Sequence, residues 1–307
     1  MELHQGLHRL RDEGIELYAI SYDDTEAIAD YVRASGVEFT LLSDVESRVI
    51  RRYGVLNTIV QPEDVPFYGI PFPGFCLVNE DGIIVDKLFN RHLANREGIE
   101  TILDSFAGRI QPGDDEPIES IAEDDGIRIT AFLRGGGGVL RVGPRRRLVV
   151  RFEMPDGLHV YGEPVPDGMV ATQITVHGPD GFRSEPIEAP PTEALDFPGL
   201  DQPLQVWGGV VDFVIPVYAN TDLGRALAHE SDPSIDIEVA VRYQACDDAQ
   251  CFIPRTHTLT LTVPLQPGVK PGFSRMKYGG ATAIDMDSDS HLKRMVERGA
   301  ARLAGDS

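Results

Sequence analysis

The hydrophobic pattern of this chain changes its period near residue 126. Upstream of that point, apolar residues at helical spacing alternate with short apolar runs, whereas from about residue 126 to residue 265 the helical period vanishes. Six runs of alternating apolar residues follow there, separated by glycine and proline clusters: IRITAFL, RLVVRFEM, ATQITVHG, DFVIPVYA, IDIEVAVRYQA and THTLTLTVPL. Because 307 residues suffice for two cores, we expect an α/β domain followed by an all-β sandwich.

The upstream region predicts the order helix, strand, helix, strand, helix, hairpin, helix, and hence a mixed sheet. Gly14 and Gly36 are expected to end the first two helices. The residues Glu80-Asp81-Gly82 between two apolar runs predict the hairpin turn. The segments in chain order are ELHQGLHRLRDEG, IELYAIS, DDTEAIADYVRASG, VEFTLLSD, VESRVIRRYGV, GFCLVNEDGIIVDKLF and NREGIETILDSFAG.

The expected domains are residues 1–107 for the α/β region and residues 126–265 for the sandwich. Residues 108–125, GRIQPGDDEPIESIAEDD, are acidic, contain proline and have almost no large apolar side chains. This composition is typical of a linker. Residues 266–307 form a tail whose second half predicts a helix from about Ser288.

The formal net charge of −21 disfavours a nucleic-acid partner, because phosphate binding needs clustered Lys and Arg. It also disfavours an anionic membrane surface. No stretch reaches the roughly 18 to 20 apolar residues of a membrane helix. The first residues, MELHQGLHRLRDEG, lack the features of a secretory signal, so the chain as written is expected to be cytoplasmic. A periplasmic or secreted location is the alternative if upstream residues are missing.

Two of the three cysteines, Cys246 and Cys251, lie in the loop between the runs EVAVRYQA and THTLTLTV. If these runs pair antiparallel, the two Cα atoms lie about 4.5–5.5 Å apart. A disulfide accepts separations of about 4.4–6.8 Å, so the pair is within bonding reach. A zinc site would need two further ligands; His257 is near, but no second cysteine pair exists, and we expect neither a metal nor another cofactor.

The pair is either a redox-active dithiol or a structural disulfide that only holds the loop closed, here called a staple. The loop is small, so its closure removes little unfolded-state entropy, and an exposed, strained disulfide is easily reduced. Nearby charges act in opposite directions: Asp247 and Asp248 raise thiol pKa values, whereas Arg255 and a protonated His257 lower them. Redox activity is the favoured hypothesis, and the staple remains open.

Residues 1–107 resemble the peroxiredoxin/AhpC-TSA (redoxin) branch of the thioredoxin fold. The stretches that carry the resemblance are LLSD followed by a helix and YGV, and IPFPGFCLV leading into NEDG. In that family a proline or arginine before this strand faces the reactive cysteine, and the thioredoxin-like counterpart has a cis peptide bond. Pro73 is the matching residue, with Pro71 as the alternative.

The redoxin family places its nucleophilic cysteine before or at the start of the helix that opens this chain. That cysteine, the preceding strand and the active-site turn are all missing, so the resemblance implies an N-terminally truncated or degenerate domain, and peroxidase activity does not follow from this sequence. Cys76 is the remaining cysteine, on a strand between Phe75 and Leu77, and we expect it to be inert core. The missing strand would lie between IELYAIS and GFCLVN, whose backbone groups then need other partners.

The β-rich region, residues 126–265, is similar to the N-terminal domain of the thiol:disulfide interchange protein DsbD. The similar stretches are RLVVRFEMPDGLHVYGEPVPDGMVATQITVHGPDGF, WGGVVDFVIPV and VRYQACDDAQCFIPRTHTLTLTV. The resemblance implies an immunoglobulin-like sandwich with a reactive pair, Cys246 and Cys251, near the start of the last hairpin. Tyr243 and Arg255 are candidates for orienting a substrate next to the pair, as Pro73 is in the first domain. For His159 and Trp207 we expect structural roles.

The preferred hypothesis is a thiol-disulfide oxidoreductase of the redoxin/peroxiredoxin-like antioxidant class. Cys246 and Cys251 would exchange electrons, through a mixed disulfide, with a thioredoxin-like protein or another protein dithiol, and without a bound cofactor. The alternative is a non-catalytic immunoglobulin-like binding module with a structural disulfide, fused to a degenerate redoxin scaffold.

Overall fold

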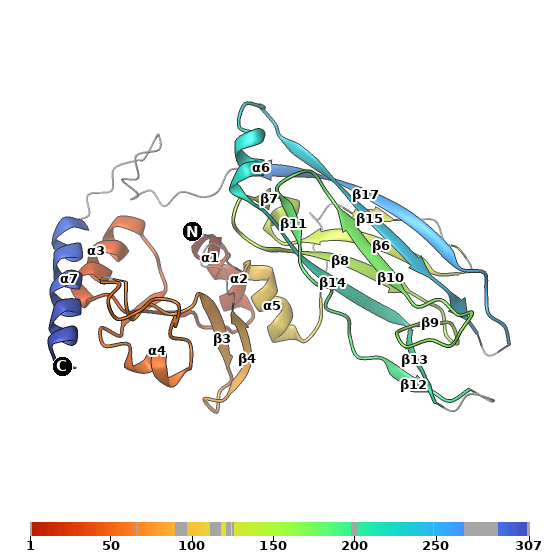
Figure 1. The fold of residues 1–307 in the computed structure, drawn as a ribbon, viewed down its shortest axis with the longest axis horizontal. Coiled ribbons are helices and arrows are strands. Elements are labelled where there is room, and N and C mark those ends of the chain that lie inside the picture. Colours follow the sequence, from red (N-terminus) through yellow and green to blue (C-terminus); the bar gives the residue numbers. More distant parts are fainter. Residues whose placement is uncertain are drawn as a thin grey trace. The chain divides into compact units, whose positions relative to one another are not determined.

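The computed structural model describes residues 2–65, 67–89, 97–110, 118–120, 124, 126–197, 202–247, 249–266 and 288–305. The chain divides into two compact units. Unit 1 comprises residues 1–99 and 269–307, and unit 2 comprises residues 100–268. Figure 1 shows unit 1 as the helix-rich part of the chain and unit 2 as the β-rich part.

Unit 1 consists of short helices and strands. They are α1 Glu2–Gln5, α2 Leu7–Asp12, β1 Tyr18–Ser21, α3 Thr25–Ser35, β2 Thr40–Ser43, α4 Arg48–Arg52, β3 Gly74–Val78, β4 Ile84–Phe89 and α7 Ser288–Gly305. Helix α3 begins after Asp24, whose side chain accepts a hydrogen bond from the Ala27 backbone N–H at 2.8 Å. It ends, as predicted, at Gly36, where the backbone φ of 66° suits glycine. The predicted hairpin is confirmed, since β3 and β4 pair antiparallel.

The strands of unit 1 form two separate two-stranded sheets, and the predicted mixed sheet is wrong in this respect. β1 pairs with β2 in parallel, and β3 pairs with β4 antiparallel. A ladder needs a neighbouring strand about 4.8 Å away, and among the described residues no strand pairs with the second edge of β1 or of β3.

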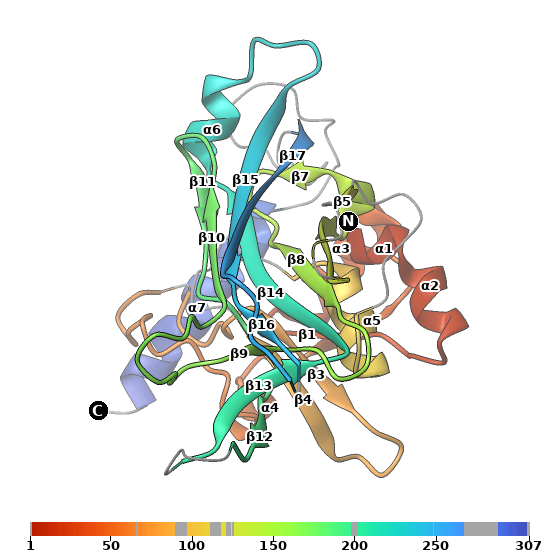
Figure 2. The same cartoon turned by 90° about the vertical axis from the view of Figure 1, so that its right-hand side faces the viewer.

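Unit 2 is a β-sandwich, which confirms the predicted all-β architecture. Its elements are α5 Ile99–Ala107 at the unit boundary, β5 Ile118–Ser120, β6 Arg128–Arg134, the 3-10 turn η1 Gly136–Gly138, β7 Leu140–Arg141, β8 Arg146–Glu153, β9 His159–Tyr161, β10 Gln173–His177, β11 Phe182–Ser184, β12 Glu193–Leu195, β13 Leu204–Gly208, β14 Val210–Ala219, α6 Thr221–Ala226, β15 Ser234–Tyr243, β16 Ala245–Cys246 and β17 Arg255–Gln266. One sheet has the order β10-β15-β17-β7, and the other has the order β11-β14-β8-β6-β5. Figure 2 shows β15 and β17 in front of β8 and β14. Strand β5 lies within the segment expected to be a linker and pairs with β6.

The main core of unit 2 lies between these two sheets. Along β15, buried and exposed side chains alternate, as the sequence predicts for a strand with one face on the core. Ile237, Val239 and Val241 are fully buried there. The predicted antiparallel pairing of this run with THTLTLTV is confirmed, because β15 and β17 pair from Ser234 opposite Pro264 to Tyr243 opposite Arg255.

A third sheet has the order β12-β13-β9-β16, and its two faces belong to different clusters. Val160 of β9 and Ala245 of β16 pack into the main core. The next residues, Tyr161 and Cys246, point to the opposite face because successive side chains of a strand alternate. They form a second, smaller cluster with Leu204 and Val206 of β13.

Candidate functional site

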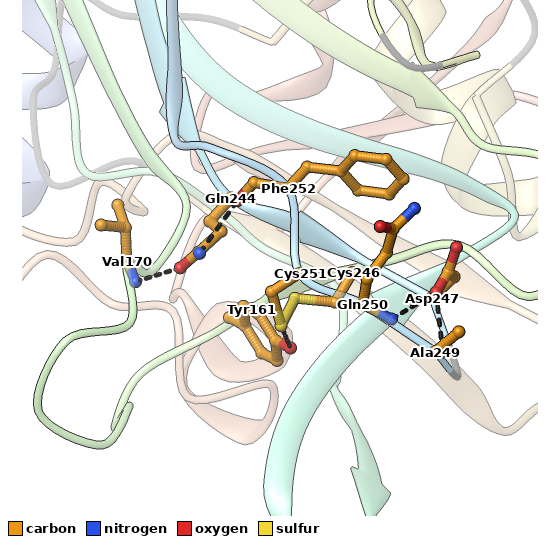
Figure 3. Close-up of a disulfide and its surroundings, with 9 residues drawn as sticks. All are labelled: Tyr161, Val170, Gln244, Cys246, Asp247, Ala249, Gln250, Cys251 and Phe252. Atoms are coloured by element: carbon orange, nitrogen blue, oxygen red, sulfur yellow. Dashed lines mark hydrogen bonds between the residues drawn. A yellow bond between two sulfur atoms is a disulfide. The ribbon is translucent and has the colours of Figure 1, made fainter.

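The two cysteines of the last hairpin are joined by a disulfide (Figure 3). The β15–β17 ladder stops at Tyr243, and the chain then enters β16, which pairs with β9. Cys246 and Cys251 face each other as an isolated antiparallel bridge with their Cα atoms 4.1 Å apart. The predicted bonding reach is confirmed, and the separation is shorter than expected because the cysteines lie outside the β15–β17 ladder.

The two bonded cysteines differ in their exposure to solvent. Cys246 is 1 % exposed and belongs to the second cluster, whereas Cys251 is exposed. Cys251 is therefore the member of the pair that another molecule meets at the surface, whereas Cys246 is covered.

The loop between the cysteines is held by Asp247. One of its carboxylate oxygens accepts hydrogen bonds from the backbone N–H groups of Ala249 and Gln250, both at 2.7 Å (Figure 3). These bonds hold the pKa of Asp247 below its usual range. The carboxylate therefore stays charged beside the pair, as the sequence predicts, while Asp248 lies outside the described residues.

Gln244 ties the cysteine loop to the neighbouring segment. Its side-chain oxygen accepts a hydrogen bond from the Val170 N–H at 2.9 Å, and its amide donates to the Phe252 carbonyl at 3.1 Å. The Phe252 N–H in turn donates to the Ala245 carbonyl at 2.9 Å. Gln244 is 8 % exposed, so these bonds fix the chain on both sides of the disulfide without covering Cys251.

Strand β9 lies directly against the pair and contributes two side chains. Tyr161 places its hydroxyl 3.6 Å from the Cys251 sulfur (Figure 3). Burial raises the pKa of Tyr161, so the hydroxyl stays protonated. His159 is the cross-strand partner of Cys246, and its ring packs edge-on against Tyr161 with the centroids 5.3 Å apart.

Tyr161 and Gln244 did not emerge from the sequence as functional residues. Their neighbours along the chain gave a weak signal, since Gln244 stands two residues before Cys246 and Tyr161 ends the short run HVY. The contact between β9 and β16 joins residues about 85 positions apart in sequence, and no local sequence pattern predicts it.

The residues that the sequence analysis placed near the pair occupy different surroundings. Tyr243 is 2 % exposed and packs in the main core, with its ring centroid 5.5 Å from that of Phe152. Arg255 is exposed at the start of β17, opposite Tyr243. The His257 ring nitrogen lies 3.2 Å from an Asp124 carboxylate oxygen. Orienting roles for Tyr243 and Arg255 stay predictions.

The candidates of unit 1 lie on or next to β3. Pro73 immediately precedes this strand and is half-buried, and its role also stays a prediction. The peptide bond before Pro73 is not cis, contrary to the expectation; among the described residues the cis bond is Glu163–Pro164. The Phe72 N–H just before Pro73 donates to the Val55 carbonyl at 2.7 Å, which holds the segment in an extended course. Cys76 is a half-buried free thiol whose pKa is raised by burial.

The residues that the structure describes contain neither a metal-binding cluster nor a membrane-spanning helix. No group of three or more His, Cys, Asp or Glu side chains is placed to hold a metal ion there. In the same part of the chain, no helix is long and apolar enough to cross a membrane.

Comparison with known families divides the chain as its fold does. Residues 1–87 match the model of the AhpC/TSA family. Residues 141–263 match the model described as thiol:disulfide interchange protein DsbD, N-terminal. The chain therefore resembles a different family in each of these two parts. Both resemblances seen in the sequence are thereby confirmed, and the second match contains the whole disulfide loop.

Several solved structures resemble about half of this chain at low identity. The N-terminal periplasmic domain of ScsB from Proteus mirabilis is 16 % identical over 48 % of this chain, with a TM-score of 0.33. This chain spans about half of that structure, 51 %. The reduced DsbD N-terminal domain of Neisseria meningitidis is 13 % identical over 48 % of this chain and 85 % of its own, with a TM-score of 0.25. The yeast GGA1 GAE domain is 13 % identical over 47 % of this chain and 97 % of its own, with a TM-score of 0.26. No curated protein matches the chain.

Proposed function

We propose that unit 2 is a thiol-disulfide oxidoreductase that exchanges electrons through Cys246 and Cys251. The observation that carries this proposal is the unequal exposure of the two bonded cysteines: Cys251 is exposed and Cys246 is 1 % exposed. The match of residues 141–263 to the DsbD N-terminal family supports it, because that family is named for thiol:disulfide interchange.

The exposure pattern defines the order of events. A partner thiolate attacks the Cys251 sulfur, a mixed disulfide forms, and Cys246 leaves with the electron pair of the broken S–S bond. The partner's second thiolate then attacks the mixed disulfide and releases Cys251. The partner is oxidised and the pair is reduced by two electrons, and the same steps reversed oxidise the pair.

The partner that we propose is a thioredoxin-like protein or another protein dithiol on a separate molecule. Resolution of the mixed disulfide needs two thiols on the partner. Unit 1 has Cys76 as its single cysteine, so it offers no dithiol. Arg255, exposed at the start of β17, is the residue that we propose orients the partner at the loop.

The compartment that we propose is the periplasm rather than the cytoplasm. Disulfides persist in oxidising compartments and are rare where glutathione and thioredoxin keep thiols reduced. The match to the DsbD N-terminal family and the joined state of the pair both fit the periplasmic alternative.

The rival function is a binding module whose disulfide is only structural. The buried Cys246 and the hydrogen-bonded Asp247 loop are the features that favour it. The reduction potential of the pair separates the two functions: a value below about −300 mV marks a structural bond, and one of about −270 mV or higher supports exchange.

A trapping experiment tests the proposed order of attack in a Cys76→Ser background. The Cys246→Ala variant, which keeps the exposed Cys251, is converted to its mixed disulfide with 5-thio-2-nitrobenzoate. Thioredoxin lacking its second active-site cysteine is then added. We expect one equivalent of the coloured thiolate to be released and a covalent complex of the two proteins to accumulate.

The matched control is Cys251→Ala in the same background, which keeps only the buried Cys246. We expect this variant to label slowly and to trap no thioredoxin. If the mixed disulfide of Cys246→Ala with 5-thio-2-nitrobenzoate forms but does not react with thioredoxin, the exchange function is refuted. Equal trapping of thioredoxin by both variants would refute the assignment of Cys251 as the attacked sulfur.

A further inference from the structure

Four residues form one row across adjacent strands of the third sheet. Gly208 of β13 is opposite His159 of β9, His159 is opposite Cys246 of β16, and Cys246 is opposite Cys251. Directly opposite residues of antiparallel strands project to the same face with Cβ atoms about 4.5–5.5 Å apart. The His159 side chain therefore stands beside Cys246, on the side away from the disulfide partner. Gly208 has no side chain that could cover His159 from the β13 side, and His159 is half-exposed.

Opening the disulfide creates a chemical problem at Cys246. When Cys251 is attacked, Cys246 leaves as a thiolate, yet this residue is 1 % exposed and lies in an apolar cluster with Leu204 and Val206. A charge left in such surroundings without water or a partner is strongly disfavoured. A proton delivered to the sulfur as it leaves removes this penalty and favours opening.

Among the residues that the structure describes around the disulfide, three titratable side chains stand close to it: Tyr161, Asp247 and His159. The first two are poor proton donors. Burial raises the pKa of Tyr161, so its hydroxyl holds its proton, and this hydroxyl lies against the Cys251 sulfur. Hydrogen bonds from the Ala249 and Gln250 N–H groups hold the pKa of Asp247 below its usual range, so its carboxylate has no proton to give. The third is His159, and an imidazole changes charge between about pH 5 and 8.

We propose that His159 donates the proton that neutralises Cys246 when the disulfide opens, so that dithiols reduce the pair faster as the imidazole becomes charged. This inference rests on the proposed exchange at Cys246 and Cys251. It assigns His159 a role in the reaction in place of the structural role expected from the sequence.

A dithiol contributes a thiolate, whose sulfur bonds to Cys251 as the bond from Cys251 to Cys246 breaks. The electron pair of the broken bond goes to the Cys246 sulfur, which takes a proton from the His159 imidazolium. The second thiolate of the dithiol then displaces Cys251, leaving an oxidised dithiol and a reduced pair.

The charges that face His159 favour this role. Asp247, in the loop after β16, interacts electrostatically with His159, and its carboxylate attracts a proton-bearing imidazole. Tyr161 packs edge-on against the ring from β9 itself and is neutral. Cys246 is the facing group on β16, and on β13 the opposite residue is Gly208, which carries no charge.

The test is the rate of disulfide reduction by dithiothreitol from pH 5.5 to 8.5, divided at each pH by the concentration of dithiothreitol thiolate. For the full chain we expect this corrected rate to rise as the pH falls through the imidazole range. His159→Gln should flatten the profile, with a loss of about a hundredfold at pH 6, the scale of general acid catalysis. At pH 8.5, where an imidazole is neutral, we expect the two rates to agree within about twofold.

His177→Gln is the matched control, because His177 is exposed on β10 in a different sheet. It should retain the profile of the unsubstituted chain. His159→Ala guards against a variant that fails for structural reasons: added imidazole should restore its rate at pH 6 but leave that of His159→Gln unchanged. A His159→Gln profile parallel to that of the unsubstituted chain, or His159→Ala that imidazole fails to rescue, would overturn the inference.

This design separates the two proposals. Dithiothreitol is small and needs no docking surface, so its reaction reports on His159 even where a thioredoxin-like protein fails to react. A normal pH profile with dithiothreitol combined with no trapping of thioredoxin would refute the proposed function and leave the His159 role standing. Trapping combined with a flat profile in the unsubstituted chain would refute the His159 role alone.

Discussion

The hydroxyl of Tyr161 offers a direct way to test how the fold sets the redox behaviour of the disulfide. It lies 3.6 Å from the Cys251 sulfur, and the residue is 1 % exposed, so its position is set by β9 and not by solvent. In the oxidised state the sulfur is a weak acceptor. After reduction, the Cys251 thiolate can accept a hydrogen bond from this hydroxyl, and such bonds to charged groups contribute about 1.5–3 kcal/mol.

Tyr161→Phe removes this stabilisation of the reduced state and little else. Since 30 mV corresponds to about 1.4 kcal/mol for a two-electron couple, the reduction potential should fall by about 30–65 mV. The effect should grow with pH as the Cys251 thiolate forms. Because burial raises the pKa of Tyr161, its hydroxyl remains a donor across the range in which the thiols ionise.

The potential is measured by equilibration of the chain with dithiothreitol buffers between pH 7 and 9.5, with the thiols quenched by alkylation. Tyr218→Phe is the control, because Tyr218 lies on β14 in the five-stranded sheet. A potential for Tyr161→Phe within about 10 mV of the parent at every pH, well below the 30 mV scale, would show that the hydroxyl does not act on the thiolate. A rise in potential would show that the contact stabilises the disulfide instead.

Three further predictions concern stability and thiol reactivity. The cysteines are five positions apart, and closing a loop of about six residues stabilises the fold by about 2 kcal/mol of chain entropy. Cys251→Ser should therefore lower the melting temperature of unit 2 by about 4–8 °C at most. Calorimetry that finds unit 2 of this variant unfolded at 25 °C would support the staple instead. Cys76 should react with iodoacetamide at pH 8 at least about tenfold more slowly than a free thiol, because burial raises its pKa, and labelling at the rate of a model peptide would contradict this. Asp24 is partly desolvated, which opposes ionisation, but the Ala27 N–H, Arg294 and Arg298 hold its pKa well below the usual range. The stabilising contribution of the Asp24 carboxylate is therefore present above about pH 3.9 and is lost as the pH falls through the lower pKa of the folded state. Asp24→Asn should lower the melting temperature at pH 7, and this effect should shrink below pH 4. An effect that is constant with pH would refute this prediction.

Local patterns were sufficient to predict most of the elements and the position of the disulfide. The alternation of apolar and polar residues in IDIEVAVRYQA and THTLTLTVPL indicates which side chains face the core. Antiparallel pairing of two such runs brings the ends of their connecting loop together. The bonding reach of Cys246 and Cys251 follows from these short-range facts. The caps of α3 follow in the same way, because Asp24 and Gly36 satisfy backbone groups only a few residues away.

The sequence was less informative wherever a hydrogen-bond ladder joins distant segments. Its helix and strand order predicted one mixed sheet in unit 1, whereas the structure has two separate pairs. The redoxin resemblance had indicated a missing strand between IELYAIS and GFCLVN, and no strand lies between β1 and β3 among the described residues. The sequence likewise singled out Tyr243 as a neighbour of the disulfide because Tyr243 is close in sequence, whereas this residue is 2 % exposed and packs in the main core.

The surroundings of the two sulfurs depend on one such ladder. At Gln244 the chain leaves the sheet of β15 and β17, and β16 pairs with β9, which places His159 opposite Cys246 and the Tyr161 hydroxyl against Cys251. The same step buries Cys246 and leaves Cys251 exposed. The alternation of side chains along a strand determines only the face of the sheet on which each side chain lies. Its neighbours on that face come from strands far away in sequence, and these neighbours set exposure, charge and reactivity.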